Sequence, residues 1–203
     1  MFLIALGYWV YQFFTNDPDS VGWQFRYLTH WALTLSVISA LFMLRLSRGD
    51  STNRHEVFAS VTVVMNIMVV FLYWKIFLTD PTQFYVDGIP TNPWHQEYYF
   101  HLVGPILQWI DAFFLLGVFR PIRQIAIWLV VVVASYTVWI EAIVRPFNDD
   151  RAGTVTSGLP YRFLNNMEWP DRLLFYGQYT LAALGFMGLC WFLARGLRRV
   201  RPA

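Results

Sequence analysis

The sequence predicts an all-α membrane protein that consists of a single bundle of six transmembrane helices, with both termini in the cytoplasm. Its 203 residues are 57% hydrophobic and only 14% charged, whereas soluble domains carry about 25% charged residues. Apolar runs recur along the whole chain, at lengths close to the roughly 20 residues that cross a bilayer core of about 30 Å. No linker, low-complexity tract or repeat of about 20–50 residues divides the chain. We therefore expect one domain over residues 1–203.

Six apolar segments supply the predicted helices. In chain order they are Met1–Phe14, Tyr27–Leu46, Val57–Leu78, Tyr98–Phe119, Ile122–Val144 and Leu173–Ala194. The first segment is short, because its 14 residues rise only about 21 Å in an α-helix. It either crosses a thinned bilayer with little tilt or lacks its natural beginning. It does not resemble a signal peptide, since no basic residue precedes it and no small-residue cleavage site follows it.

The positions of Lys and Arg determine the expected orientation. Nine basic residues lie between spans two and three, between spans four and five, or after span six: Arg45, Arg48, Arg54, Arg120, Arg123, Arg195, Arg198, Arg199 and Arg201. Only Asp50 and Glu56 accompany them, and the opposite connections hold nine acidic residues against six basic ones. Because positive loops stay inside, we expect cytoplasmic termini, in a bacterial inner membrane. The basic residues suit lipid headgroups rather than nucleic acid, so membrane lipids are the expected partners.

Two long extracytoplasmic connections are expected to be structured caps or lids. They cover about Thr79–Glu97 and Arg145–Arg172 and contain six of the ten prolines, a density that favours turns over helices. Connections of this length are often functional. The single cysteine, Cys190, can form no disulfide within the chain and gives no evidence on the redox compartment.

Thr29 is the first candidate for a catalytic role. It lies about one turn into the second span, and Leu33, Ser36 and Ala40 continue its stripe at helical spacing. Small residues on this stripe allow another helix to approach closely, so we expect Thr29 to face the bundle interior. The alternative is that its hydroxyl bonds the carbonyl four residues earlier, as threonines in membrane helices often do.

His101 supplies the base that a threonine nucleophile needs. It enters the fourth span about four residues, or roughly 6 Å, after Glu97, while Thr29 lies about three residues, or roughly 5 Å, after Arg26. The hydroxyl and the imidazole therefore have matching depths on different helices. An imidazole with a pKa near 6.5 can take a proton from a hydroxyl and return it to a leaving group, which suits acyl transfer or ester hydrolysis. The alternative is a structural, hydrogen-bonded histidine at a helix end.

Three carboxylates compete to orient His101. Asp111 is on the same helix but about 15 Å further along, too far for a hydrogen bond, so we expect it to be structural. Glu141 lies near the outer end of the fifth span at a suitable depth and is the preferred candidate. Its i+4 neighbour Arg145 also offers it an ordinary ion pair. Glu97, one turn before His101, has a similar explanation as a helix-end carboxylate.

A polar cluster is also expected between the third and fourth spans. Asn66 lies in the third span, and Gln108 and Asp111 lie in the fourth. Polar side chains inside a membrane bundle hydrogen-bond across helices. These three residues are therefore expected to tie the two helices together rather than to act in catalysis.

Three short segments resemble one known family. They are Val21-Gly22-Trp23-Gln24-Phe25-Arg26-Tyr27-Leu28-Thr29, Phe100-His101-Leu102-Val103-Gly104-Pro105-Ile106-Leu107 and Tyr161-Arg162-Phe163-Leu164-Asn165. In order and spacing they resemble segments of the androgen-induced membrane proteins, multi-pass threonine hydrolases that cleave fatty acid esters of hydroxy fatty acids. The resemblance implies a distant bacterial relative in which Thr29 is the nucleophile and His101 is the catalytic histidine.

The resemblance also implies how a substrate would lie. Its acyl chains would lie among the apolar helices with the ester near the outer headgroup level, and His101 would take the Thr29 proton as an acyl-threonine forms. Trp23 is a candidate indole donor to the oxyanion, and Arg26 is a candidate for holding a substrate carboxylate. The alternative for Arg26 is a helix-end cation that extends to the interface.

Two other classes of function stay open. One is a non-enzymatic helical subunit of a larger membrane assembly with a protein partner, which the ten Trp and the short first span favour. The other is a haem or another tetrapyrrole held between His30 and His101. Adjacent residues on a helix point about 100° apart, so Thr29 and His30 cannot both face His101 well. Otherwise no cofactor, metal or nucleotide is expected, because the histidines lack ligand spacing and no glycine-rich phosphate loop occurs.

Overall fold

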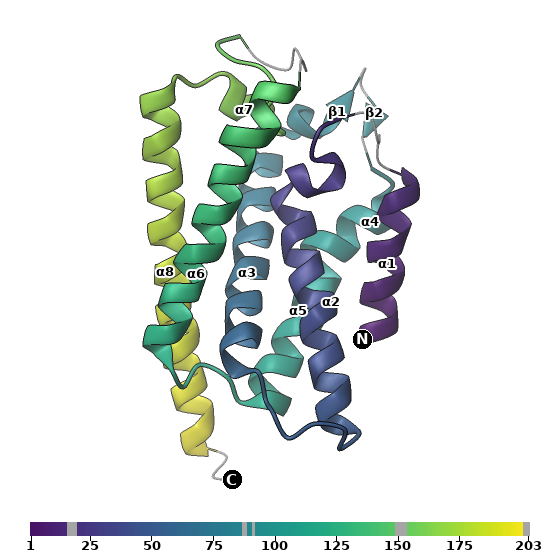
Figure 1. Ribbon diagram of the computed structural model, residues 1–203, viewed down its shortest axis with the longest axis vertical. Coiled ribbons are helices and arrows are strands. Elements are labelled where there is room, and N and C mark those ends of the chain that lie inside the picture. Colours follow the sequence, from purple (N-terminus) through teal and green to yellow (C-terminus); the bar gives the residue numbers. More distant parts are fainter. Residues whose placement is uncertain (16–19, 87–88, 91, 149–153, 201–203) are drawn as a thin grey trace.

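The computed structural model describes residues 1–15, 20–86, 89–90, 92–148 and 154–200 (Figure 1). Most of these residues are helical, which confirms the predicted all-α class. Five helical segments are long and apolar enough to cross a membrane: Leu28–Ser47, Glu56–Thr79, Trp94–Leu116, Ile122–Phe147 and Trp169–Arg199. A further apolar helix, α1 (Phe2–Thr15), has only 14 residues. The fold is that of a multi-pass membrane protein.

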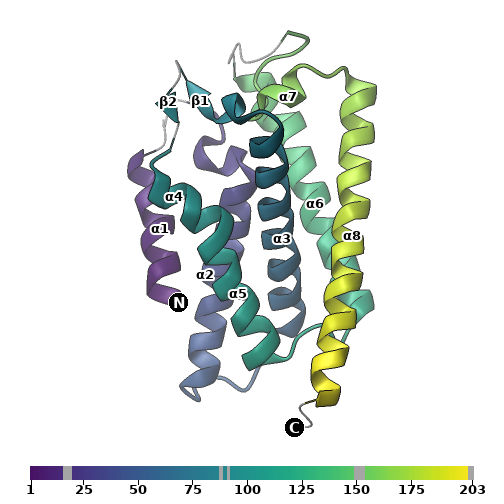
Figure 2. The ribbon, with the colours of Figure 1, turned by 180° about the vertical axis from the view of Figure 1, so that it is seen from behind.

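The remaining elements follow in chain order. They are η1 (Trp23–Arg26), α2 (Leu28–Ser47), α3 (Glu56–Thr79), η2 (Pro81–Phe84), β1 (Tyr85–Val86), β2 (Ile89–Pro90), α4 (Trp94–Tyr98), η3 (Tyr99–Val103), α5 (Gly104–Ile110), η4 (Asp111–Leu116), α6 (Ile122–Val138), η5 (Trp139–Val144), η6 (Arg145–Phe147), α7 (Arg162–Asn165) and α8 (Trp169–Val200). The η segments are 3₁₀ turns, except that η3, η4 and η5 are π turns. Figure 2 shows that α4 and α5 belong to one bent helical segment.

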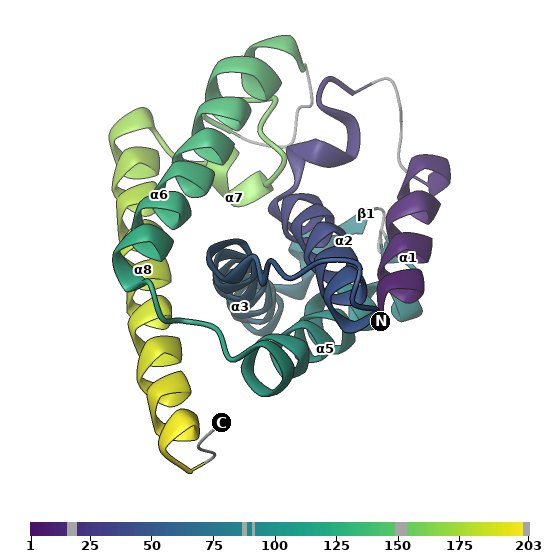
Figure 3. The same cartoon turned by 60° about the horizontal axis from the view of Figure 1, so that its bottom comes forward.

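Helix α3 lies at the centre of the bundle (Figure 3). It packs against α2, α5, α6 and α8. Its apolar residues face every direction instead of forming one stripe, a pattern typical of a helix that is buried on all sides. Val63 and Val64 are accordingly 0% exposed. The cavity described below therefore has α3 as its central wall.

Two amides join the helices around α3. Asn66 Nδ2 donates to Ser36 Oγ at 2.8 Å, and Gln108 Nε2 donates to Ser39 Oγ at 2.9 Å. Both serines belong to α2, where their small side chains let the neighbouring helices come close enough for an amide to reach across. In place of the expected cluster with Asp111, each amide thus ties its own helix to α2.

The two ends of the bundle differ in charge and in structure. At one end, which we call the basic end, Arg54 donates to the Leu116 carbonyl and Arg198 Nη1 donates to the Val118 carbonyl at 2.9 Å. The C-terminus is at this end (Figure 1, bottom). The strands β1 and β2 and helix α7 are at the opposite end, which we call the hairpin end. The basic residues thus gather at one end, as the sequence predicts.

The hairpin end contains short strands and short helical segments where it is described, whereas the sequence favoured turns over helices there. Strands β1 and β2 pair antiparallel, with Tyr85 opposite Pro90. In the second connection, Gly158 has a φ of +87°, and a Cβ at this position would lie 2.2 Å from the Arg145 carbonyl oxygen. Only glycine fits such a close approach in the left-handed region. The connection is therefore packed directly on the end of the α6 segment.

Candidate active site

A cavity inside the bundle, which we call the inner cavity, lies between α2, α3, η3, the α6 segment and α8. The cavity has a volume of about 110 Å³. Most of its lining is apolar. The polar lining residues are Thr29, Tyr73, His101, Tyr136, Thr137, Tyr161, Tyr176 and Tyr179. The candidate nucleophile and the candidate base thus line the same cavity.

The Thr29 hydroxyl does not hydrogen-bond a backbone carbonyl of its own helix. The carbonyl four residues earlier is that of Phe25, and it already accepts two indole N–H groups. Trp31 Nε1 donates to it at 2.8 Å and Trp139 Nε1 at 3.0 Å. Among the described residues, the Thr29 hydroxyl has no hydrogen-bond partner. Because α2 begins at Leu28 and Phe25 lies in η1, this hydroxyl has no carbonyl one turn earlier on its own helix and is available to a molecule in the inner cavity.

Other hydroxyls in the bundle behave as the alternative predicted for Thr29. Thr34 donates to the His30 carbonyl at 2.7 Å, and Thr137 donates to the Val133 carbonyl at 3.1 Å. Each of these bonds joins a threonine to the carbonyl four residues earlier, the usual arrangement in membrane helices. Thr29 departs from this pattern because it is the second residue of α2, so the residue four positions earlier, Phe25, lies in the separate turn η1 and not on the same helix.

His101 lies in the π turn η3, and the sequence around it explains this turn. Pro105 has no N–H and so cannot bond the His101 carbonyl four residues earlier. That carbonyl instead accepts the indole N–H of Trp74 on α3 at 3.0 Å. The Gly104 N–H bonds the Tyr99 carbonyl five residues earlier, and a Cβ on Gly104 would lie 2.9 Å from that oxygen. Such π turns are frequent at functional sites.

The His101 ring is held on one edge and on one face. Its Nδ1 lies 3.0 Å from the Glu97 carbonyl oxygen and 3.1 Å from Glu97 Oε2. Asn92 Nδ2 donates to the other carboxylate oxygen of Glu97 at 2.7 Å. The Tyr73 ring stacks on the imidazole with a centroid distance of 3.6 Å and an interplanar angle of 5°. With Nδ1–H donating to Glu97, Nε2 is the nitrogen left to act as a base.

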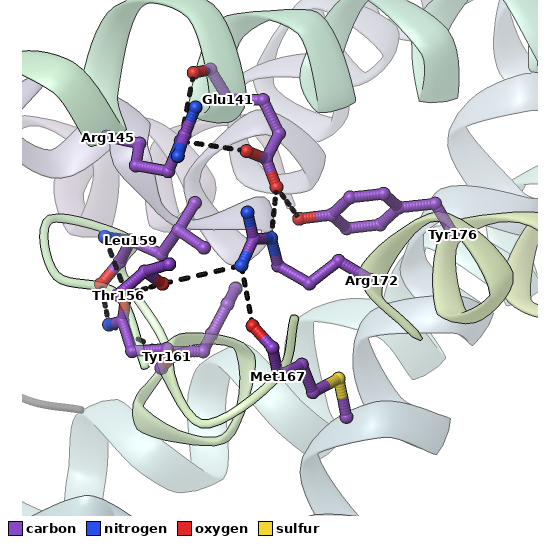
Figure 4. Close-up of polar contacts among 9 residues, drawn as sticks. Glu141, Arg145, Thr156, Leu159, Tyr161, Met167, Arg172 and Tyr176 are labelled. Atoms are coloured by element: carbon purple, nitrogen blue, oxygen red, sulfur yellow. Dashed lines mark hydrogen bonds and ion pairs between the residues drawn. The ribbon is translucent and has the colours of Figure 1, made fainter. Parts of the chain in front are cut away.

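Glu141, the carboxylate that the sequence favoured, has other partners (Figure 4). It forms the expected ion pair with Arg145, whose Nε lies 3.0 Å from Oε2. Its Oε1 accepts bonds from Arg172 Nε at 2.9 Å and from the Tyr176 hydroxyl at 2.8 Å. The carboxylate in contact with His101 is therefore that of Glu97, one helical turn away. Glu141 instead joins the end of the α6 segment to α8.

Three further candidates lie away from the inner cavity. His30 Nε2 lies 2.9 Å from Gln12 Oε1 and so is directed towards α1. The Trp23 ring packs on α1, and the Arg26 guanidinium lies 5.1 Å from the centroid of the Tyr27 ring. Among the residues that line the cavity in the described chain, none of these three occurs. The structure thus joins Thr29 and His101 but does not bring His30, Trp23 or Arg26 to them.

A second hollow, which we call the outer groove, adjoins the inner cavity at the hairpin end. Its volume is about 720 Å³. Aromatic residues form most of its lining, together with Glu97, and Tyr73 and Phe84 line both the groove and the inner cavity. Two aromatic side chains thus separate the candidate catalytic groups from a wider opening.

Sequence reasoning missed Tyr73, Trp74 and Tyr161 as parts of the site. Tyr73 and Trp74 contact His101 from another helix, and nothing in the local pattern of α3 marks them out from its other aromatic residues. Tyr161 lies within one of the segments that carry the family resemblance, but its hydroxyl position depends on how the second long connection folds. Only the spacing of Glu97 and His101, four residues apart in a helix, was a usable signal.

Comparison with known families gives a match. A family model described as FAR-17a/AIG1-like protein matches residues 1–195. The chain belongs to the FAR-17a/AIG1-like family. This confirms the predicted resemblance to the androgen-induced proteins. No curated protein and no solved structure matches the chain. The matched region includes both Thr29 and His101.

Proposed function

We propose that the protein is an intramembrane hydrolase of lipid esters, with Thr29 as nucleophile and His101 as base. The observation that carries this proposal is that a threonine hydroxyl without a hydrogen-bond partner among the described residues and an imidazole held by a carboxylate line one apolar cavity. Membership of the FAR-17a/AIG1-like family supports it, because that family is linked to hydrolase activity.

The proposed reaction has two steps. His101 Nε2 takes the Thr29 proton as Oγ1 attacks the ester carbonyl carbon, and the imidazolium then protonates the departing alcohol oxygen as its bond to carbon breaks. A water molecule, deprotonated by the same nitrogen, next attacks the acyl-threonine and releases the carboxylic acid. Glu97 keeps Nδ1 protonated and stabilises the imidazolium, the role that the carboxylate has in serine hydrolases.

The location of the site supports a lipid substrate. The lining of the inner cavity between the helices is mainly apolar and suits an acyl chain, and the outer groove offers a route from the hairpin end. We place the hairpin end outside the cytoplasm and both termini inside, with α1 as a sixth span, because the basic residues lie at the other end. Membrane lipids are then both the surroundings and the source of substrate.

A fluorophosphonate probe tests this proposal, because it phosphorylates an activated hydroxyl nucleophile. The purified protein should be labelled, Thr29→Ala and His101→Ala should not be, and Thr29→Ser should retain part of the labelling. The matched control is Thr137→Ala, since Thr137 also lines the inner cavity but its hydroxyl is bonded to Val133. Equal labelling of the wild-type protein and Thr29→Ala would exclude Thr29 as the nucleophile.

A further inference from the structure

Five tyrosines line the inner cavity, and their hydroxyls use their protons differently. The five are Tyr73, Tyr136, Tyr161, Tyr176 and Tyr179. Tyr136 donates to the Arg26 carbonyl at 3.0 Å, and Tyr176 donates to Glu141 at 2.8 Å. Each of these two hydroxyls therefore already donates its proton to an acceptor within the protein. A hydroxyl that only accepts a bond from the protein keeps a proton for a ligand.

Tyr161 has such a hydroxyl, next to the candidate nucleophile. Its oxygen accepts the backbone N–H of Leu28 at 3.1 Å. Leu28 is the first residue of α2 and directly precedes Thr29. The first N–H groups of a helix have no partner within the helix, so this bond satisfies one of them at the start of α2. It also holds the Tyr161 oxygen at the residue that directly precedes Thr29.

The protonation state of Tyr161 suits a donor. Burial raises the pKa of the Tyr161 phenol above its usual value of 10.0, although the hydrogen bonds that its oxygen makes with the Leu28 N–H and the Tyr136 hydroxyl oppose the rise. The group is thus neutral at physiological pH and cannot act as a base. It can, however, donate a hydrogen bond to an oxygen on which negative charge develops.

The segment that carries Tyr161 is fixed by Asn165, which is 0% exposed. Asn165 Nδ2 donates to the Leu159 carbonyl at 2.9 Å, and Asn165 Oδ1 accepts the Leu159 N–H at 3.2 Å. The Tyr161 carbonyl accepts the Leu164 N–H at 3.1 Å. These bonds close the turn on both sides of Tyr161. Its hydroxyl therefore needs little reorganisation when charge appears near it, which is the condition for effective electrostatic stabilisation.

We propose that the Tyr161 hydroxyl donates a hydrogen bond to the ester carbonyl oxygen when Thr29 attacks, so that Tyr161 is an oxyanion-stabilising catalytic residue. This inference rests on the proposed hydrolase function and supplies a donor for its first step. As the carbonyl carbon becomes tetrahedral, its π electron pair moves to the oxygen, and the Tyr161 bond stabilises that charge without transferring the proton. Trp23, the donor candidate from sequence, packs on α1 instead.

Phenylalanine substitutions at two tyrosines, one inside the cavity and one outside it, test this assignment. Tyr161→Phe should lower kcat for ester hydrolysis by about 10²–10³-fold, the usual effect of removing one oxyanion donor, with KM nearly unchanged. Tyr8→Phe is the control, because Tyr8 is not among the residues that line the inner cavity and packs through its ring on Tyr99. It should keep kcat within a few-fold of the wild-type value.

Inhibitor binding separates a catalytic role from a structural one. A trifluoromethyl ketone forms a charged tetrahedral adduct with a hydroxyl nucleophile, whereas the corresponding ether analogue of the substrate does not. Tyr161→Phe should weaken the trifluoromethyl ketone in proportion to the loss in kcat/KM and leave the ether analogue unaffected. Equal weakening of both compounds would show that Tyr161 only shapes the cavity, and would overturn the assignment.

Two further outcomes distinguish this inference from the hydrolase proposal. If fluorophosphonate labels the wild-type protein and not Thr29→Ala, while Tyr161→Phe hydrolyses esters at the wild-type rate, only the role of Tyr161 is wrong. If the wild-type protein is neither labelled nor active, both proposals fall.

Should Tyr161→Phe not fold, a fluorinated tyrosine at position 161 keeps the hydroxyl and makes it more acidic. It should raise kcat, whereas the same replacement at position 8 should not, and an unchanged rate would overturn the assignment.

Discussion

The indole N–H of Trp74 donates to the backbone carbonyl of His101 at 3.0 Å, across the interface between α3 and η3. This bond exists because Pro105 supplies no N–H to that carbonyl. The proline thus creates an unsatisfied acceptor, and the neighbouring helix satisfies it. The position of the candidate base is therefore set by a bond between two helices as well as by its own helix.

The first prediction concerns Pro105→Ala. An alanine restores the N–H that can bond the His101 carbonyl, so the π turn should tighten towards an α-helix and shift the imidazole. Because small misplacements of catalytic groups are costly, we expect ester hydrolysis to fall by about 10²-fold. The midpoint of thermal unfolding in detergent should stay the same or rise, since proline is unfavourable inside helices.

The control for this prediction is Trp74→Phe, which removes the donor but keeps Pro105. It should also lower activity, but it should lower the unfolding midpoint as well, because the His101 carbonyl loses its partner. Full activity in Pro105→Ala would show that the π turn does not position His101.

The second prediction concerns the two indoles on the Phe25 carbonyl. The double variant Trp31→Phe with Trp139→Phe removes both donors to this carbonyl, so η1, the turn that leads into α2, loses its bonds to α2 and to the α6 segment. The unfolding midpoint should fall, since a buried carbonyl without a partner costs about 1–3 kcal/mol, and fluorophosphonate labelling should slow because the start of α2 that carries Thr29 is no longer held.

Trp109→Phe is the control for the two indole variants. The Trp109 indole N–H is buried and has no hydrogen-bond partner among the described residues, so its loss should leave labelling unchanged. If the double variant is labelled as fast as the wild-type protein, the two indoles do not position the start of α2 that carries Thr29.

The helices could be predicted well from the sequence because a bilayer fixes their length. The predicted spans Tyr27–Leu46 and Val57–Leu78 differ by one residue at each end from α2, Leu28–Ser47, and α3, Glu56–Thr79. Helix α8, Trp169–Val200, extends well beyond the predicted Leu173–Ala194. Its extra turns are polar, and hydropathy reports where a helix enters the apolar core, not where it ends.

The depths of Thr29 and His101 could be predicted because depth in a helix follows from counting residues. The choice between Glu97 and Glu141 could not be made in that way. Arg172, which is 1% exposed and bonds Glu141, lies 31 residues further along the chain. No local pattern shows that such a partner will occupy Glu141, and only the packing of α8 on the α6 segment brings the two charges together.

The third prediction separates these two carboxylates. Glu97→Gln should lower kcat by about 10²-fold or more, because an amide no longer stabilises the imidazolium, with little change in the unfolding midpoint. Glu141→Gln should do the reverse. It leaves Arg172 buried without its counter-charge, which costs about 3–5 kcal/mol of unfolding free energy, while the rate per folded molecule should be nearly unchanged.

The measurements are ester hydrolysis and thermal unfolding of the same purified preparations. A Glu141→Gln protein that is as stable as the wild type but inactive would assign the orienting role to Glu141, as the sequence alone suggested. A Glu97→Gln protein with full activity would remove the carboxylate from the proposed mechanism.

The last prediction concerns the side of the membrane on which the site opens. The only native cysteine, Cys190, is buried, so single cysteines added at exposed positions can be read without interference. Asp50 lies at the basic end and Thr82 at the hairpin end, and both are exposed. In spheroplasts, an impermeant maleimide should label Thr82→Cys and should label Asp50→Cys only after lysis, because loops rich in Arg stay in the cytoplasm. The opposite pattern would invert the proposed orientation.

The same result decides which leaflet supplies the ester, because the outer groove and Glu97 are at the hairpin end. Labelling at Thr82 would place the entry to His101 in the outer leaflet.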